Sequence, residues 1–454
     1  MSSPPPRKPA AGAAAEASAS ASSAASADNA APPRVHGDQD RQRYLREFCD
    51  LLWPSPAMVT FAGPALGRAG TSSAGASSAG AGGGSRGTQS EFILLLGMRR
   101  PRLLIPAARR ASAAAVRGYG EPGSRTAQLG SRVLSVALAS GLGGAMLRSR
   151  IRVHAPPGTE TIESFLREAL GRDLLISAYL GPARANRKPV LQLLSSRGQP
   201  AGFAKIGTSP LTRALVQAER DALTRLGQAG LTDVTVPRVL HYGEWREMNV
   251  LVLSALPVWL RRRPVDGAQL DAAMKSVAGV GGRRGEPLAA GSYWQRLTSR
   301  LAAADESAER DTLLGALAAL SARAGDAQLA LGSWHGDWTP WNMASTSGGL
   351  LVWDWERFTD GVPLGFDALH YRLQRDVVPG QREPRAAAAA CIEDAPGSLA
   401  AFGLSASEAR ITGILYLADL ATRYLADRQA QAGAVLGAPG RWLIPAITDQ
   451  VSRL

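Results

Sequence analysis

The stretch LGSWHGDWTPWNMASTSGGLLVWDWERF, Leu331 to Phe358, decides the fold of this 454-residue chain. Asn342 follows Asp337 by five residues, and Asp354 comes after a turn at 348–349 and a short apolar strand at 350–352. Phosphoryl transfer from a nucleotide needs one carboxylate to orient the acceptor hydroxyl, and an amide oxygen with a second carboxylate to hold Mg²⁺. Asp337, Asn342 and Asp354 place these three groups on adjacent loops, which indicates a phosphotransferase site.

The motif HGD-x-x-x-x-N followed by VWDWE resembles the catalytic segment of the aminoglycoside phosphotransferase and choline kinase family, a branch of the protein-kinase-like fold. The resemblance covers about residues 160–430. It implies an α+β, two-lobed fold with a small antiparallel sheet lobe and a larger helical lobe. It also implies that Asp337 is the catalytic base, that Asn342 and Asp354 bind Mg²⁺, and that the cofactors are ATP and Mg²⁺.

A kinase-like fold needs a strand lysine for the nucleotide phosphates and a helical glutamate that holds this lysine. Lys205 lies in the predicted strand GFAKIG, and it is one of only four lysines in a chain with 51 lysines and arginines. A helix is predicted from Pro210 onward, because the residues before it are helix-capping types. On this helix Glu219 is predicted to point inward, since it shares a face with Leu215, Ala222, Leu223 and Leu226.

The loop predicted to cover the phosphates is residues 181–188, between two strands. It holds a single glycine where a protein-kinase loop has three, so we expect Arg187 or Lys188 to neutralise phosphate charge. The segment 253–257, just after the strand VLVL, is the predicted hinge on the adenine side. Ser254 and Leu256 are therefore the candidate nucleotide contacts there.

Tryptophan is concentrated around the predicted catalytic loop, with five of the ten tryptophans of the chain between residues 334 and 355. Two interpretations remain open. The rings pack under the loop as core, or they line the acceptor pocket by stacking on a sugar or an ammonium group. The candidates for the acceptor pocket are Trp338, Trp341 and Glu356.

Composition divides the chain into four parts. Residues 1–38 are rich in Ala, Ser and Pro and are predicted to be a disordered tail. Residues 39–155 form an Arg-rich, amino-terminal accessory region with a Gly/Ser loop at 67–90, and this region is predicted to pack against the sheet lobe. Residues 156–258 are the predicted sheet, or nucleotide, lobe, and residues 259–454 the predicted helical lobe, which carries catalysis and acceptor binding.

Charge and cysteine content limit the partners. The net charge is +13, but the excess of arginine is spread through an Ala- and Gly-rich chain, so no specific nucleic acid is expected. Residues 91–155 hold eleven arginines against two glutamates, which favours weak contact with an anionic surface. No apolar run reaches the about 18 residues of a membrane span. The two cysteines, far apart in the sequence, fit a reducing compartment, and we expect the cytoplasm.

These observations predict an ATP- and Mg²⁺-dependent phosphotransferase that acts on a hydroxyl of a small molecule, such as an amino sugar, a sugar, a choline-like alcohol or an amino alcohol. One alternative is a nucleotide-binding regulatory or scaffold protein on the same fold, against which the complete set of polar residues argues. Another is a Ser/Thr protein kinase. The short segment that follows Asp354 favours a small acceptor over a protein.

Overall fold

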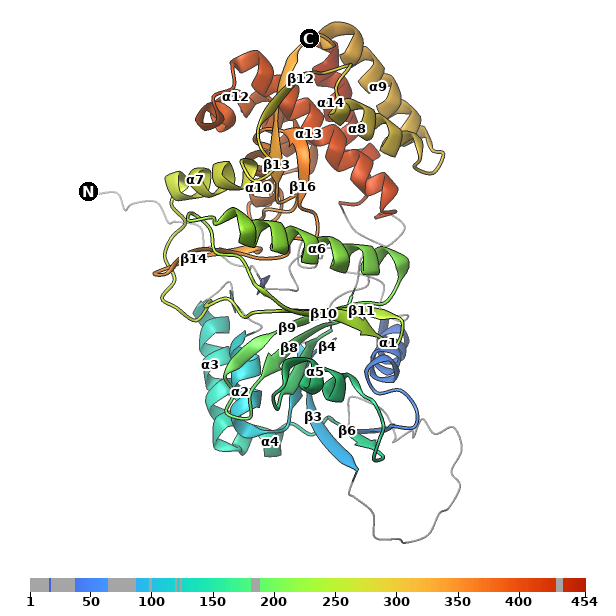
Figure 1. The fold of residues 1–454 in the computed structure, drawn as a ribbon, viewed down its shortest axis with the longest axis vertical. Coiled ribbons are helices and arrows are strands. Elements are labelled where there is room, and N and C mark those ends of the chain that lie inside the picture. The colour runs from blue at the N-terminus through green and yellow to red at the C-terminus, as the bar shows by residue number, and fades with distance from the viewer. Residues whose placement is uncertain are drawn as a thin grey trace, which may run out of the picture.

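The computed structural model of the chain describes residues 16–17, 37–63, 87–97, 100–118, 121–122, 125–180, 188–429 and 436–454. Two lobes follow one another along the long axis of the molecule, with the sheet lobe below the helical lobe in Figure 1. The fold class predicted from the sequence, α+β with two lobes, is confirmed. The predicted tail at 1–38 and the Gly/Ser loop at 67–90 lie almost entirely outside the described residues.

The sheet lobe is built on nine antiparallel strands in the order β10-β11-β9-β8-β7-β4-β3-β6-β2. The strands are β2 (Met58–Ala62), β3 (Thr88–Gly97), β4 (Arg100–Pro106), β6 (Arg150–Ala155), β7 (Leu175–Tyr179), β8 (Val190–Leu194), β9 (Pro200–Gly207), β10 (Val239–Trp245) and β11 (Met248–Leu253). The sheet runs across the predicted boundary at residue 155, because β4 of the accessory region pairs with β7. The strands of the accessory region therefore extend the same sheet beyond β7.

Alternation along the strands explains why both faces of the sheet carry helices. Phe92 and Leu94 of β3 are buried in one core cluster, whereas Ile93, between them, is buried in another on the opposite face. The first cluster includes α1 (Gly37–Leu52) and α5 (Ile162–Leu170), and the second includes α2 (Arg109–Gly118) and α3 (Arg125–Ser140). Helix α4 (Leu142–Met146) follows α3, and a short pair joins β1 (Glu16–Ala17) to β5 (Glu121–Pro122).

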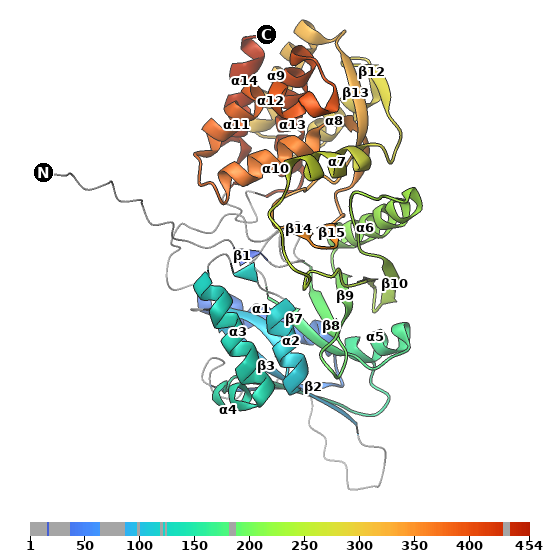
Figure 2. The ribbon, with the colours of Figure 1, turned by 90° about the vertical axis from the view of Figure 1, so that its left-hand side faces the viewer.

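Helix α6 (Pro210–Ala229) lies between the sheet and the helical lobe in both views (Figures 1 and 2). It begins at a capping box, in which the Ser209 side chain accepts from the Thr212 amide and the Thr212 side chain accepts from the Ser209 amide. Pro210 occupies its first turn, as the sequence predicts. Its buried face includes Val216 and Leu223, which join the same core cluster as Leu251 of β11.

The helical lobe surrounds one large core that includes the carboxyl-terminal helices. Its helices are α7 (Gly267–Ala278), α8 (Ser292–Ala302), α9 (Ala308–Ala324), α10 (Phe366–Val377), α11 (Pro384–Glu393), α12 (Ala395–Leu399), α13 (Ala406–Ala426) and α14 (Leu443–Ser452), with short 3₁₀ turns at Ala400–Phe402 and Pro439–Arg441. Its strands are β12 (Arg284–Pro287), β13 (Gln328–Trp334), β14 (Met343–Thr346), β15 (Gly349–Val352) and β16 (Thr359–Pro363). Strands β14 and β15 form the hairpin that separates Asn342 from Asp354.

No helix among the described residues is long and apolar enough to cross a membrane.

Candidate active site

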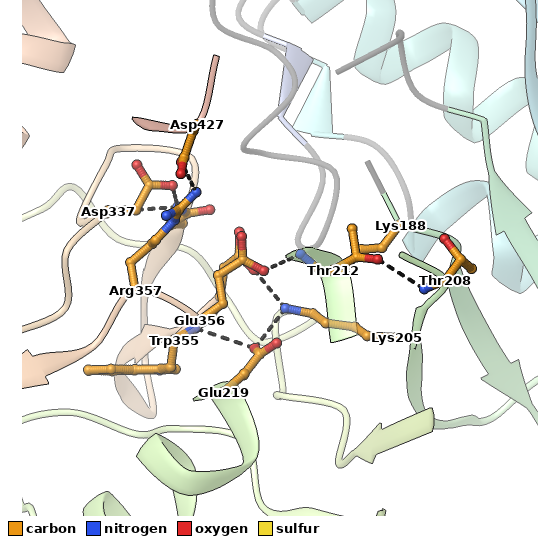
Figure 3. Close-up of polar contacts among 12 residues, drawn as sticks. Lys188, Lys205, Thr208, Thr212, Glu219, Asp337, Trp355, Glu356, Arg357 and Asp427 are labelled. Carbon is orange, nitrogen blue, oxygen red and sulfur yellow. Dashed lines mark hydrogen bonds and ion pairs between the residues drawn. The ribbon is translucent and has the colours of Figure 1, made fainter. Parts of the chain in front are cut away.

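Lys205 stands at the centre of the site, because β9 is an interior strand of the sheet. Lys205 pairs with Leu251 of β11 on one side and with Val190 of β8 on the other. Its ammonium nitrogen lies 2.7 Å from Glu219 Oε1 on α6 (Figure 3). It also lies 2.7 Å from Asp354 Oδ1. The side chains of all three residues are at most 4% exposed. The structure thus joins a strand, a helix and the loop after β15 at one buried ammonium group.

A third carboxylate and a second lysine complete this group. The Lys188 ammonium group forms an ion pair with Glu356 Oε2, and both side chains are buried. Glu219, Asp354 and Glu356 each offer a carboxylate oxygen within 4.8 Å of the other two. We call Lys188, Lys205 and these three carboxylates the phosphate-side cluster. Arg187, the other candidate on the preceding loop, lies outside the described residues.

The pKa shifts in the phosphate-side cluster follow from burial and from the two lysines. Burial alone would raise the pKa of Asp354, but Lys205 and Lys188 overcome this effect and lower it to about 2. Burial would lower the pKa of Lys205, yet Asp354 and Glu219 raise it. Glu219 keeps a raised pKa because burial outweighs the attraction of Lys205. Asp354 is therefore held as a carboxylate and Lys205 as an ammonium group.

The donor set fits a hard divalent cation. Carboxylate and amide oxygens are the ligands that Mg²⁺ prefers. Glu219 Oε2 is buried and has no hydrogen-bond partner within the described part of the chain. The Asn342 amide nitrogen donates to Asp337, and the amide oxygen of this residue is of the ligand type that Mg²⁺ prefers. Asp354 adopts φ +69°, a left-handed conformation that aspartate tolerates and that directs its carboxylate to Lys205.

Asp337 lies on the loop between β13 and β14, and its side chain is 24% exposed, more than any carboxylate of the phosphate-side cluster. Asn342 Nδ2 donates to Asp337 Oδ2 at 3.0 Å and to the Asp337 backbone oxygen at 2.8 Å. These two bonds close the five-residue loop that the sequence motif predicts. They fix the carboxylate beside the proposed metal ligand while leaving one side of it open to solvent.

A buried histidine, which the sequence analysis did not identify, holds the other oxygen of Asp337. His370 Nε2 on α10 lies 3.1 Å from Asp337 Oδ1, and His370 Nδ1 lies 2.9 Å from the hydroxyl of Tyr416 on α13. Burial lowers the pKa of His370 and raises that of Tyr416, so the imidazole is neutral and the phenol protonated. We assign the bonds accordingly: Tyr416 donates to Nδ1, and Nε2–H donates to Asp337.

Side chains of α10 and α13 hold the backbone of the loop that carries Asp337. Asp367 at the start of α10 accepts from the amides of His335 at 2.7 Å and Gly336 at 3.2 Å. Arg423 of α13 donates to the Gly336 carbonyl at 2.6 Å. Burial lowers the pKa of His335 to about 4, so His335 is neutral. Its Nδ1 accepts from the Asp337 amide and its Nε2 donates to the Trp353 carbonyl, which links the loops that carry Asp337 and Asp354.

The predicted hinge follows β11 directly. Ser254 bonds across to Arg238, donating its backbone amide to the Arg238 carbonyl at 2.8 Å and accepting the Arg238 amide on its hydroxyl at 2.9 Å. Leu256 is buried in a small apolar cluster with Ala344, Leu351 and Trp353, from the β14–β15 hairpin and the residue after it. This cluster connects the predicted hinge to Trp353, the residue before Asp354. Its apolar side chains suit contact with the flat base of a nucleotide.

The structure separates the three candidates for the acceptor pocket. Trp338 is fully buried and packs against His335 and Trp355, which favours the core-packing interpretation for this ring. Trp341 retains 9% exposure on the catalytic loop. Glu356 belongs to the phosphate-side cluster through Lys188. All five tryptophans of the segment are buried, and Trp341 retains the largest exposed fraction among them.

Comparisons with known proteins agree with the motif. Residues 201–402 match the sequence model of the phosphotransferase enzyme family (APH). No curated protein matches the chain in sequence.

Three solved structures that resemble the chain are kinases. A thermostable mutant of aminoglycoside phosphotransferase APH(4)-Ia without ligand is 14% identical, with a TM-score of 0.44, and the match covers 64% of this chain and 98% of that one. Choline kinase LicA from Streptococcus pneumoniae is 14% identical, with a TM-score of 0.40 and 64% and 99% covered. Amicoumacin kinase hAmiN is 12% identical, with a TM-score of 0.37 and 62% and 88% covered.

The match spans Lys205, Glu219, Asp337, Asn342 and Asp354, and it lies within the region where the sequence resembles kinases. The resemblance predicted from the catalytic segment is thereby confirmed, since residues 201–402 of this chain match the sequence model of the phosphotransferase enzyme family.

Proposed function

We propose that the protein transfers the γ-phosphoryl group of ATP, in the presence of Mg²⁺, to a hydroxyl group of a small molecule. The observation that carries this proposal is the division of the site into two parts. Lys205, Glu219 and Asp354 meet at one buried point, and Asp337 stands apart with a partly exposed carboxylate held by neutral donors. The first arrangement suits phosphate and metal binding, and the second suits a base.

Each residue then has a distinct role. Lys205 would hold the nucleotide phosphates, and Glu219 would orient Lys205 from α6. Lys188 is proposed to neutralise phosphate charge from the β7–β8 side, which replaces the backbone contacts that extra glycines would give. Asn342 and Asp354 would hold Mg²⁺, which supplies charge neutralisation at the phosphates when bound. Asp337 would orient the acceptor hydroxyl and take its proton.

On the nucleotide side, we assign the adenine base of ATP to the apolar cluster around Leu256 and Trp353, with Ser254 at the start of the predicted hinge. On the acceptor side, Trp341 is the remaining aromatic candidate. The acceptor classes that fit an exposed carboxylate beside an aromatic ring are amino sugars, sugars, choline-like alcohols and amino alcohols.

The decisive experiment is an acceptor screen with the full chain. ADP release is measured with Mg-ATP and a panel of aminoglycosides, choline, sugars and amino alcohols, and the product is identified by a mass increase of one phosphoryl group. Asp337→Asn is expected to lower turnover by about 10²- to 10⁴-fold with unchanged Mg-ATP affinity in calorimetry, because it removes the base and keeps the fold. Asp449→Asn, an exposed acid on α14, is the matched control.

Wild-type turnover in Asp337→Asn would exclude this residue as the base. Tight ATP binding without release of ADP across the whole panel would favour a regulatory nucleotide-binding protein. Phosphorylation of serine or threonine in a protein substrate, with no small acceptor active, would favour a protein kinase.

A further inference from the structure

Helices α3 and α4 carry an unusual concentration of exposed apolar side chains. Ten large apolar side chains of the described residues are exposed, and five of them lie between residues 129 and 146. They are Leu129 (64% exposed), Val133 (61%), Val136 (69%), Leu142 (68%) and Met146 (78%). We call these five side chains the α3–α4 patch. Large apolar side chains gathered in this way mark interaction sites more often than isolated ones do.

The α3–α4 patch is not required to fold α3. Leu129, Val133 and Val136 are spaced by four and three residues, so they lie on one face of the helix. The opposite face is already packed, because Leu138 is buried in the core cluster that includes α2. Ser135, on the same side, donates to the Ala113 carbonyl of α2 at 3.1 Å. Helix α3 therefore has a complete inner face and a second, unpartnered apolar face.

Arginines surround the α3–α4 patch. Arg132 lies on α3 between Leu129 and Val133 and is exposed, and Arg148 is exposed just after α4. The Arg109 guanidinium group lies against Gly141, at the junction of the two helices. Between residues 100 and 155 the sequence contains one acidic residue, Glu121. The stretch of sequence that carries the patch is thus almost entirely positive in charge.

We propose that the α3–α4 patch docks the protein on an anionic lipid surface. A helix face with aliphatic side chains bordered by arginines is the arrangement that lies in the interface of a bilayer, with the apolar side chains among the acyl chains and the guanidinium groups at the headgroups. Anionic headgroups complement the positive border. The surface is accessible, since α3 runs along the outside of the sheet lobe and α4 lies at the end remote from the helical lobe (Figures 1 and 2).

Other occupants fit less well. A stable protein interface uses about 20 to 30 residues on each side, whereas five side chains on two helices form the α3–α4 patch. A nucleic acid would contact the arginines but would leave the aliphatic side chains at the centre in water. A lipid surface satisfies both parts of the patch without a complementary fold.

Co-sedimentation of the full-length protein with vesicles tests this proposal. Vesicles of phosphatidylcholine are compared with vesicles that also contain phosphatidylglycerol, at low and high salt. We expect binding to the anionic vesicles that weakens as salt is raised. The triple variant Leu129→Gln/Val133→Gln/Val136→Gln should lower the partition coefficient by at least about tenfold, since it removes the side chains that enter the acyl region. Arg132→Gln/Arg148→Gln should weaken binding to anionic vesicles alone.

The matched control is Met58→Gln/Leu240→Gln, which removes two exposed apolar side chains elsewhere on the sheet lobe. Thermal unfolding of every variant checks the fold, which exposed substitutions should preserve, and Mg-ATP binding in the same samples is independent of the lipid result. Three outcomes would overturn the proposal: no binding to anionic vesicles, binding that the triple variant leaves unchanged, or a concentration-dependent dimer in sedimentation velocity that the triple variant abolishes while vesicles are not bound.

Discussion

Around Lys205, three buried carboxylates face two ammonium groups, whereas the hydrogen bonds to the Asp337 carboxylate come from an imidazole and an amide. The first region is closed to solvent and the second is partly open. The guanidinium group of Arg357, which follows Glu356 in the sequence, forms an ion pair with Asp427. The difference has a chemical meaning. Paired charges create a fixed place for phosphates and metal ions, while a partly exposed carboxylate held by an imidazole and an amide suits contact with an acceptor hydroxyl.

The largest effect is expected from breaking the phosphate-side cluster at Asp354. Asp354→Ala should lower the Mg²⁺-dependent affinity for ATP by at least about 100-fold, because the proposed metal ligand and a partner of Lys205 are lost together. Isothermal calorimetry with and without Mg²⁺ measures this effect. Asp337→Asn serves as the control on the other side of the comparison, and equal Mg-ATP affinities in wild type and Asp354→Ala would remove Asp354 from the metal site.

His335, between the two regions, makes stability depend on pH. Burial lowers its pKa from 6.5 to about 4, so the unfolded chain binds a proton more readily than the folded chain. The stabilising contribution is complete above pH 6.5 and is lost as the pH falls toward about 4, amounting to roughly 3 kcal/mol. Urea unfolding across this range should show a flatter pH dependence for His335→Gln than for wild type. Parallel curves would contradict a neutral, buried His335.

The ion pair between Lys205 and Glu219 can be measured by a double-mutant cycle. Lys205→Ala and Glu219→Ala should be non-additive in the free energy of unfolding, with a coupling of about 0.5 to 3 kcal/mol, because each single change already removes the buried contact between the two side chains. The exposed pair Arg385 and Asp449 provides the comparison, for which a coupling of about 0.2 to 1 kcal/mol is expected. Additive effects at Lys205 and Glu219 would show that the two side chains do not interact.

The smallest effect is expected on the base side. His370→Leu should lower kcat by roughly tenfold and leave Mg-ATP affinity unchanged, because one hydrogen bond to Asp337 is lost while the phosphate-side cluster is untouched. His370→Gln keeps an N–H donor and should recover part of the rate. Tyr416→Phe, one bond further from Asp337, should cost less than His370→Leu. A fall in melting temperature without a change in kcat would mean that His370 has only a packing role.

The sequence predicted the residues around Lys205 better than the residues that hold Asp337. Lys205, Glu219 and Asp354 were found from a rare lysine, an inward helix face and a spaced motif, and the structure joins them within 2.7 Å of one nitrogen. His370 and Tyr416 were missed, because they lie 33 and 79 residues beyond Asp337 on two helices with no shared motif. One signal was available, since the chain contains only five histidines.

The amino-acid sequence by itself determined the local structure: the strand that carries Lys205, the capped helix that carries Glu219 and the loop closed by Asn342. These features depend on periodicity, capping residues and turns, which act over a few neighbouring residues. Only the tertiary structure decided that the accessory strands extend the sheet through β4 and β7, that Trp338 is core, and that His370 meets Asp337. Such contacts join residues far apart in the chain, and packing between whole elements selects them.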